Sequence, residues 1–299
     1  MHSDTFYRLA LSRVHKVGPV LTRLLMDHFE SAEAVFQATP KELRAISGIA
    51  DKTIGELKMP QAQVEADRII RFAERNGIRI HHYLDEDYPT RCKNHHAAPA
   101  ILYSTGTVDL NHQRTVAVVG TRKPSARGIR QTERLLSSLR DFQPMIISGL
   151  AYGIDICAHR EALKIGLPTT GVLGSGLDKV YPAAHRLTAK QMQEHGGLIS
   201  TYPHWMGPER DHFPARNRIV AMLSDIVIVI ESAERGGSII TANMTRELKK
   251  PIGAFPGRYD DKSSAGCNLL IKADGAHLVE SGDDIARILG WHRSELHNQ

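Results

Sequence analysis

A short stretch near the middle of the chain combines glycine, threonine and basic side chains in a pattern suited to binding anions. Residues 116–128 read V-A-V-V-G-T-R-K-P-S-A-R-G, which is an apolar run followed by a glycine and a basic loop. The apolar run predicts a buried strand, and Ser125 or Ala126 is expected to begin a helix. The N–H groups that open such a helix carry partial positive charge and favour phosphate. We therefore predict an anion site built on Gly120, Thr121 and Arg122.

Basic side chains around this turn strengthen the prediction unequally. Arg122 offers a planar fork that can bind two phosphate oxygens, and Lys123, Arg127 and Arg130 add positive potential. Many strand–turn–helix units carry surface basic residues without any ligand. Taken singly, Lys123 and Arg130 fit that plainer explanation, whereas the cluster of glycine, threonine and arginine does not.

Three further apolar runs end in small residues that let a backbone approach a phosphate closely. Gly149 and Gly153 lie in S-G-L-A-Y-G-I-D, G-S-G follows Leu173, and E-S-A-E-R-G-G-S follows Ile230. In the last of these, Gly237 and Ser238 are expected to open a helix that Ser238 caps. Ligands of parallel sheets bind at the carboxyl ends of the strands, so these loops are predicted to share one edge.

The segment H-F-P-A-R-N-R, residues 212–218, concentrates basic and aromatic side chains at the expected start of a helix near Pro214. Such a mixture suits a single strand of nucleic acid, with phosphates on Arg216 or Arg218 beside Asn217 and a base stacked on Phe213. Two alternatives stay open, namely that Phe213 is a buried packing residue and that one arginine belongs to an internal ion pair.

Signatures of a cofactor, a metal or a catalytic centre are missing from the sequence. G-S-G at residues 174–176 resembles the start of a dinucleotide fingerprint, but Lys179 stands where the third glycine belongs, and there is no P-loop. The motifs H-E-x-x-H and G-x-S-x-G are absent as well. Asp155 and Glu231 are interpreted as structural carboxylates. We therefore expect no cofactor, no metal and no enzymatic activity.

The three cysteines, Cys92, Cys157 and Cys267, stand alone without C-x-x-C spacing, which indicates a reducing compartment rather than disulfides or a zinc site. Cys92 lies near His95 and His96, but neighbouring histidines point in different directions, and a surface loop is the expectation. No apolar run reaches the roughly 20 residues that span a bilayer, and residues 1–11 lack signal-peptide features. A cytoplasmic protein with no membrane association is predicted.

The elements that must position these residues belong to two predicted domains. The chain has 299 residues with 41% apolar content, enough for a large core, and a formal charge of +5 that fits a polyanionic partner. Residues 1–78 show apolar spacing near 3.6 and predict helices, and residues 79–290 alternate strands with helices. Continuous β-branched runs such as 226–230 indicate strands buried on both faces, so an α/β fold with a mostly parallel sheet is expected.

Eight strands and seven helices are expected in the second domain. Strands are predicted over 100–103, 116–119, 145–148, 169–173, 197–200, 226–230, 252–255 and 277–279. Helices are predicted over 126–140, 154–165, 183–195, 214–223, 238–248, 266–273 and 282–289.

The helical domain contains a loose internal repeat. Residues 11–25 and 43–57 each place a glycine-bearing hairpin between two short helices, as helix–hairpin–helix units do. Such hairpins can present backbone N–H groups to a DNA phosphate without reading sequence. They carry little positive charge here, and packing or oligomer contacts explain them equally well, so no DNA contact is assigned to this domain.

Taken together, the motifs resemble the DNA-processing protein A (DprA/Smf) family over about residues 84–289. The resemblance rests on V-A-V-V-G-T-R-K-P-S-A-R-G, S-G-L-A-Y-G-I-D-I-C-A-H-R-E-A-L, G-V-L-G-S-G-L-D-K-V-Y-P, F-P-A-R-N-R-I-V-A, E-R-G-G-S-I-I-T-A and G-C-N-L-L-I-K-A-D-G-A. It implies an extended Rossmann-like domain that dimerises, preceded by a sterile-alpha-motif-like (SAM-like) helical domain. It also implies sequence-independent binding and protection of single-stranded DNA, and loading of the RecA recombinase onto incoming DNA during natural transformation.

The resemblance also assigns residues. The family's phosphate-binding G-[ST]-R motif falls on Gly120, Thr121 and Arg122, and the DNA site is expected to include the basic and aromatic residues introduced above. The full predicted set is Gly120, Thr121, Arg122, Lys123, Gly149, Gly153, Phe213, Arg216, Asn217, Arg218, Gly237 and Ser238. Many members continue into a winged-helix domain, whereas residues 291–299 are expected to form only a tail.

An enzyme of another class is the alternative. Phosphoribohydrolases that resemble lysine decarboxylases carry a P-G-G-x-G-T-x-x-E loop, and Gly236, Gly237, Ser238 and Thr241 stand at a comparable strand end. The residue three positions after Thr241 is Met244, so the catalytic glutamate of that loop is missing.

Overall fold

The computed structural model describes residues 3–273 and 275–292, so residues 293–299 of the predicted C-terminal tail lie outside the described part. The chain divides into two compact units, Met1–Tyr103 and Ser104–Gln299. Residues 79–103 thus belong to the same compact unit as the preceding helices. The domain boundary expected at residue 79 stays a prediction.

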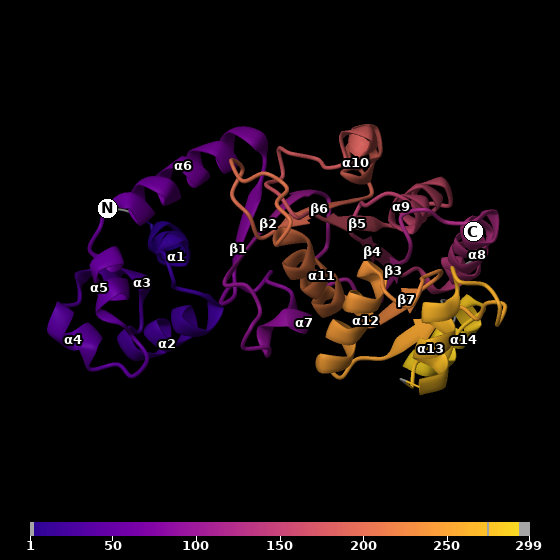
Figure 1. Cartoon of the computed structure of the whole chain (residues 1–299). Helices are drawn as coiled ribbons and strands as arrows, with labels where there is room; N and C mark the ends of the chain where they lie inside the picture. The colour runs from indigo at the N-terminus through magenta and orange to yellow at the C-terminus, as the bar shows by residue number, and fades with distance from the viewer. Residues whose placement is uncertain (1–2, 274, 293–299) are drawn as a thin grey trace. The chain divides into compact units, whose positions relative to one another are not determined.

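The first unit begins with six helices whose apolar faces form their own core (Figure 1). Leu25, Val35, Leu43 and Leu57 lie in this core and are almost fully buried. The apolar spacing of residues 1–78 predicted helices throughout this region. The six helices are α1 (Asp4–Arg13), α2 (Pro19–Phe29), α3 (Ala32–Gln37), α4 (Pro40–Arg44), α5 (Asp51–Leu57) and α6 (Gln61–Asn76).

Local chemistry explains where these short helices begin. Ser31 caps α3 by accepting a hydrogen bond from the Ala34 N–H, and Thr39 and Glu42 form a reciprocal capping box at α4. Proline stands at the first position of α2 and α4, where its missing N–H has no helical acceptor to lose. The pairs α1–α2 and α4–α5 are the two predicted helix–hairpin–helix units.

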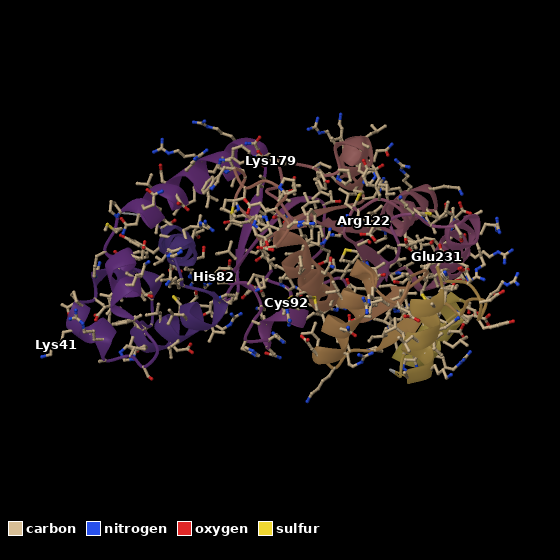
Figure 2. All side chains as sticks on the ribbon, viewed as in Figure 1. Lys41, His82, Cys92, Arg122, Lys179 and Glu231 are labelled. Carbon is tan, nitrogen blue, oxygen red and sulfur yellow. The ribbon has the colours of Figure 1, made fainter. Side chains whose placement is uncertain are left out.

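The rest of the first unit contains one strand pair and a short helix. β1 (Arg79–His82) neighbours β2 (Ile101–Gly106), and α7 (Thr90–Lys93) lies between them in sequence. The expectation that Cys92 lies in a surface loop is wrong, because Cys92 stands on α7 and is fully buried (Figure 2). A four-residue helix leaves too little periodicity for the sequence to reveal it.

A largely parallel sheet forms the centre of the second unit, as predicted. From β2 onward the strand order is β2-β6-β5-β4-β3-β7-β8-β9, and every pair from β6 to β9 is parallel. β3 is central and pairs with β4 on one side and β7 on the other. The strands are β3 (Thr115–Val119), β4 (Met145–Ser148), β5 (Thr169–Val172), β6 (Gly196–Ser200), β7 (Ile226–Val229), β8 (Ile252–Ala254) and β9 (His277–Leu278).

Helices cover both faces of this sheet. Val118, Ile146 and Ile228 pack against Leu135 of α8 and Ile154 of α9 in one apolar core, which α14 also enters. On the other face α11 crosses β3, β4 and β5, while α12 lies against β7 and β8 (Figure 1). The helices are α8 (Ala126–Leu139), α9 (Ile154–Lys164), α10 (Arg186–Met192), α11 (His212–Leu223), α12 (Gly237–Glu247), α13 (Ala265–Ala273) and α14 (Gly282–Leu289).

Several boundaries differ from the predictions. The helix expected over 183–195 is a 3-10 turn, Ala183–His185, followed by the seven-residue α10. α11 begins at His212, two residues before Pro214. Ile129 of α8 is 38% exposed, because the buried stripe runs through Gly128, Thr132 and Leu135 and leaves Ile129 beside it. The α/β class, the parallel sheet and the helical N-terminal region are confirmed.

Candidate nucleic-acid interface

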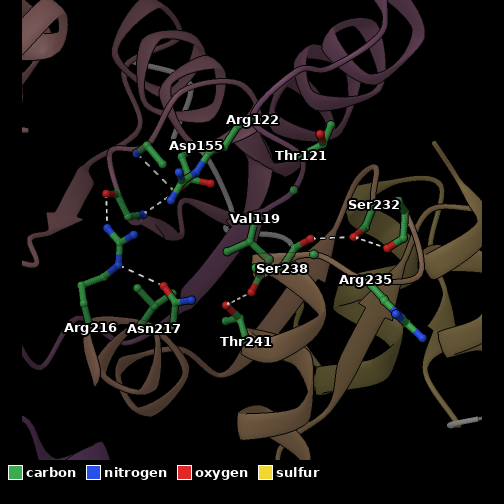
Figure 3. Close-up of a pocket in the computed structure, with 17 residues that line it drawn as sticks. Val119, Thr121, Arg122, Asp155, Arg216, Asn217, Ser232, Arg235, Ser238 and Thr241 are labelled. Carbon is green, nitrogen blue, oxygen red and sulfur yellow. Dashed lines mark hydrogen bonds between the residues drawn. The ribbon is translucent and has the colours of Figure 1, made fainter. Parts of the chain in front are cut away.

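A pocket of about 280 Å³ opens at the carboxyl ends of β3, β4 and β7 (Figure 3). Eight of the twelve predicted site residues line it, and four do not. The lining members are Gly120, Thr121, Arg122, Gly149, Arg216, Asn217, Gly237 and Ser238. The other predicted residues, Lys123, Gly153, Phe213 and Arg218, lie outside the lining.

Two backbone hydrogen bonds hold the loop after β3 at Thr121. The Thr121 N–H donates to the Glu231 carbonyl at 2.7 Å, and the Ile154 N–H donates to the Thr121 carbonyl at 3.2 Å. A Cβ on Gly120 would press on the Ile154 side chain, and a Cβ on Gly153 would collide with the Thr121 carbonyl. Gly153 also has a φ of +82°, a left-handed conformation that favours glycine. These glycines therefore shape the pocket by packing.

Helix α8 begins at Ala126, one of the two predicted positions, but a protein side chain occupies its N-terminus. Ser125 is the N-cap, and its Oγ accepts from the Gly128 N–H at 3.1 Å. The buried carboxylate of Glu231 also accepts from the Ser125 N–H at 2.8 Å, and the same carboxylate accepts from the Ser263 hydroxyl at 2.7 Å. A protein carboxylate thus lies where a phosphate was expected at the opening of α8. The long-range partner, 106 residues away, could not be foreseen from the local motif.

Helix α12 instead brings its N-terminus to the pocket. Gly236 is its N-cap, and Gly236, Gly237 and Ser238 all line the cavity. The first N–H groups of a helix have no helical acceptor and carry partial positive charge. The expectation that Ser238 caps α12 is wrong, because its hydroxyl donates to the Ser232 hydroxyl at 2.8 Å inside the same wall.

Arg216 is buried and its guanidinium holds the pocket wall together. Its Nη1 donates to the carbonyls of Gly149 and, at 2.9 Å, of Val172, and its Nε donates to Asn217 Oδ1 at 3.0 Å. One side chain from α11 therefore joins the ends of β4 and β5. These contacts favour the alternative in which one arginine of this segment has an internal role.

Asp155 supplies the opposite charge within the same wall. Its Oδ2 accepts from the backbone N–H groups of Gly149 at 3.1 Å and of Ala151 at 3.4 Å. Burial raises the pKa of Asp155 and lowers the pKa of Arg216, and the charge of each opposes the shift of the other. The structural role expected for Asp155 agrees with these contacts.

Arg122 is exposed at the mouth of the pocket, beside an aromatic ring. The guanidinium carbons of Arg122 and Arg216 each lie 5.9 Å from the centroid of the Phe213 ring. Tyr181, which is 51% exposed, has its ring centroid 6.0 Å from that of Phe213. A free cation and two neighbouring rings therefore adjoin the pocket.

The remaining predicted cations lie elsewhere. Arg218 forms an ion pair with Glu247, with 2.9 Å between Nη2 and Oε2. Lys123 is exposed, and its backbone N–H donates to the Thr121 hydroxyl at 3.2 Å. DNA contacts of these two residues stay predictions.

Two residues at or beside the pocket were not predicted from the sequence. Arg235 lines the pocket from the loop after β7, and Tyr181 stands beside Phe213. Arg235 lies within the E-R-G-G-S motif, so its position before a helix N-terminus was a usable signal. Tyr181 follows β5 at a distance that local pattern cannot place beside α11.

The described residues hold no candidate metal site. Residues 3–273 and 275–292 contain no group of three His, Cys, Asp or Glu placed to hold a metal ion, and the three cysteines are free thiols. A Cβ on Gly174 would press on the Phe213 ring, and one on Gly176 would press on the backbone of Pro203 and His204, so G-S-G serves close packing. Within the same described range, every helix is too short or too polar to cross a membrane.

The fold and the pocket define a Rossmann-like α/β protein with a cationic pocket at the carboxyl edge of its sheet. Residues 79–290 match the family described as DNA recombination-mediator protein A, and residues 8–59 match a SAM-like helix-hairpin-helix tandem. The chain belongs to the DNA recombination-mediator protein A family, which is the DprA/Smf family that its motifs resemble.

Relatives with known names support this assignment. The chain is 34% identical over 293 residues to protein Smf of Synechocystis, covering 97% of this chain and 73% of that protein. It is 41% identical over 206 residues to DNA processing protein DprA of Streptococcus pneumoniae, covering 68% of this chain and 71% of the relative.

Two solved structures are similar to the fold. The Streptococcus pneumoniae DNA processing protein A matches with a TM-score of 0.77 and 31% identity, covering 98% of this chain and 99% of that one. DNA processing protein A of Helicobacter pylori, a structure described for its single-stranded DNA binding mode, matches with a TM-score of 0.64 and 28% identity. That match covers 72% of this chain and 97% of the other.

Proposed function

We propose that the chain binds single-stranded DNA without sequence preference and delivers it to the RecA recombinase during natural transformation. The observation that carries this proposal is the pocket after β3, β4 and β7, where an exposed Arg122 and Arg235 meet the N-terminus of α12. These groups recognise phosphate, which every nucleotide shares. The single-stranded DNA binding mode described for the Helicobacter pylori relative supports this ligand.

Aromatic rings beside the pocket favour an unpaired strand over a duplex. Phe213 and the exposed Tyr181 offer faces on which bases can stack once they are free of a partner strand. Arg122 lines the phosphate pocket and adjoins the Phe213 ring. Arg122 can therefore hold a phosphate while Phe213 stacks on the adjoining base.

We assign Arg216 and Asp155 to the support of the pocket rather than to the DNA. The guanidinium of Arg216 already donates to two carbonyls and to Asn217, and Asp155 already accepts from two backbone N–H groups. A carboxylate engaged in this way is a poor general acid or base. Among the described residues, Asp155 is the only carboxylate that lines the pocket. A binding protein rather than an enzyme is therefore proposed.

The remaining parts of the proposal follow from family membership. We propose that the protein acts as a cytoplasmic homodimer and shields incoming strands from nucleases. The three free cysteines agree with a reducing compartment. Sedimentation of the purified protein tests the dimer, and a protein that stays monomeric at micromolar concentration would contradict it.

The binding proposal is tested by comparing fluorescent single-stranded and double-stranded oligonucleotides with wild type, Arg122→Ala and Arg134→Ala. Arg134 is exposed on α8 and lies outside the pocket, so it controls for loss of one positive charge. We expect wild type and Arg134→Ala to prefer single strands, and Arg122→Ala to bind all sequences more weakly. Equal affinity of the three proteins would overturn the proposed site.

Recombinase delivery needs a separate measurement. RecA filaments should form faster on strands coated with single-strand-binding protein when the chain is added, and Arg122→Ala should reduce this effect. DNA binding without faster filament formation would contradict recombinase delivery and leave only protection of the strand as the function.

Incubation with nucleoside monophosphates tests the phosphoribohydrolase alternative. Release of free base would contradict the proposal that the protein is not an enzyme.

A further inference from the structure

Three buried nitrogen atoms of the first unit have no hydrogen-bond acceptor among the described residues. They are Arg8 Nε on α1, Arg23 Nη2 on α2 and His82 Nε2 on β1. The His82 residue is 2% exposed and the Arg8 side chain 22% exposed. The phosphate pocket does not explain these atoms, because every residue that lines it belongs to the second unit.

The loop after β1 gathers the three side chains. The Asp85 carboxylate accepts from Arg8 Nη1 at 3.0 Å and from the His82 backbone N–H at 2.7 Å. The Arg23 guanidinium lies 4.5 Å from the centroid of the Tyr83 ring, and the His82 ring lies 4.4 Å from the same ring. Both arginines lie close enough to His82, which is labelled in Figure 2, for their charges to lower its pKa.

The other hydrogen bonds of these arginines fix their orientation. Arg8 Nη2 pairs with Asp4 at 2.6 Å, and Arg23 Nη1 donates to the Ala98 carbonyl at 2.9 Å. Each guanidinium is thereby anchored through one part and keeps a buried N–H elsewhere. Both anchors lie within the first unit.

The tautomer of His82 decides which ligand the cluster suits. The Leu84 N–H donates to His82 Nδ1 at 3.3 Å, so Nδ1 is an acceptor. Burial, aided by the charges of Arg8 and Arg23, lowers the pKa of His82 to about 3, and a neutral ring then carries its proton on Nε2. All three unpartnered atoms are consequently N–H donors, and two belong to positively charged groups.

We propose that Arg8, Arg23 and His82 form a binding site for one small inorganic anion, such as chloride or inorganic phosphate. The donor set excludes a metal cation, since it offers no lone pair. A bound anion would join α1, α2 and β1 and stabilise the helical unit. This site is separate from the pocket proposed for DNA.

Bromide, which scatters anomalously, locates such an anion directly in crystals of the full chain. An anomalous peak is expected within hydrogen-bond distance of His82 Nε2 after a bromide soak. Water density at that point with no bromide peak would mean that the donors are merely hydrated, and the proposal would be overturned.

Thermal unfolding tests the site in solution at constant ionic strength while chloride replaces gluconate. Wild type is expected to show a saturable rise in Tm. His82→Gln keeps an N–H donor and should retain part of this rise, whereas His82→Phe should lose it. Arg134→Ala, which removes an exposed positive charge outside both sites, should keep the full rise. An undiminished rise in His82→Phe would refute the site.

Discussion

Arg216 illustrates how one buried side chain can matter for a pocket without touching its ligand. It joins the carbonyls of Gly149 and Val172 and balances the buried charge of Asp155. Removing it would take one hydrogen-bond donor from each of two carbonyls and a neighbouring positive charge from a buried carboxylate. The structure thus separates this arginine from the exposed Arg122, although both were expected to bind phosphate.

We predict that Arg216→Met lowers the free energy of unfolding by about 3–5 kcal/mol, the usual result of leaving a buried charge unbalanced. Urea unfolding of Arg216→Met and Arg218→Met provides the comparison. The Arg218 ion pair is partly exposed, so its loss should cost at most about 1 kcal/mol. If Arg216→Met unfolds like wild type and yet loses DNA binding, the arginine contacts the strand itself.

His159 makes the second unit sensitive to acid. The residue is fully buried, and burial lowers its pKa to about 3, with further lowering by His185 and Arg216. An unfolded histidine has a pKa near 6.5, so the unfolded state binds the proton first. Stability contributed by the neutral ring is therefore present above about pH 6.5 and is lost as the pH falls towards 3.

Between pH 7 and pH 5 we expect wild type to lose about 2 kcal/mol of unfolding free energy through His159. Urea unfolding of His159→Asn across this range should show a correspondingly weaker pH dependence. His195→Asn changes an exposed histidine and should follow wild type. Parallel pH profiles for the two variants would contradict this account.

At the scale of elements, Gly153 at the start of α9 packs directly against the loop that contains Thr121. Gly153 has a left-handed φ, and a Cβ there would collide with the Thr121 carbonyl. Gly166, which follows α9, has a φ of +77° but open space around its missing Cβ. An alanine at either position would therefore have a strained backbone, but only the alanine at residue 153 would also collide with a neighbouring atom.

Gly153→Ala should destabilise the protein by more than about 1 kcal/mol and weaken single-strand binding, because the loop of Thr121 must move. Gly166→Ala should show only the strain of its backbone and keep DNA affinity. Thermal unfolding and oligonucleotide titration measure the two effects. Equal loss of affinity in both variants would remove the collision as the cause.

Local pattern predicted the elements well and their contacts poorly. β4 was placed residue for residue, since a β-branched run beside a glycine-rich loop is a local signal. α7 and the burial of Cys92 were missed, and so was the carboxylate of Glu231 at the start of α8. The helix α7 is too short to show a period, whereas the burial of Cys92 and the contact of Glu231 depend on residues far apart in sequence. Eight of the twelve motif residues nevertheless line one pocket, because parallel strands end at one edge.

At the scale of the whole molecule, the affinity for single-stranded DNA should fall steeply as the salt concentration rises. The helical unit should contribute nothing to this dependence. Each phosphate contact on a single strand contributes about 0.7 to the slope of log affinity against log salt. Arg122→Ala combined with Arg235→Ala should therefore reduce the slope by about 1.4. Lys41→Ala on α4 should leave it unchanged. A slope that Lys41→Ala flattens equally would place DNA on the helical unit as well.

The link from Arg216 to two strand ends also constrains how the family can vary over evolutionary time. A sequence that loses the guanidinium but keeps the Asp155 carboxylate leaves a buried negative charge without its positive partner. A sequence that loses both together can refill the space with apolar side chains. Substitutions at these two positions should therefore occur in pairs among living relatives, and single replacements should be rare wherever the pocket still works.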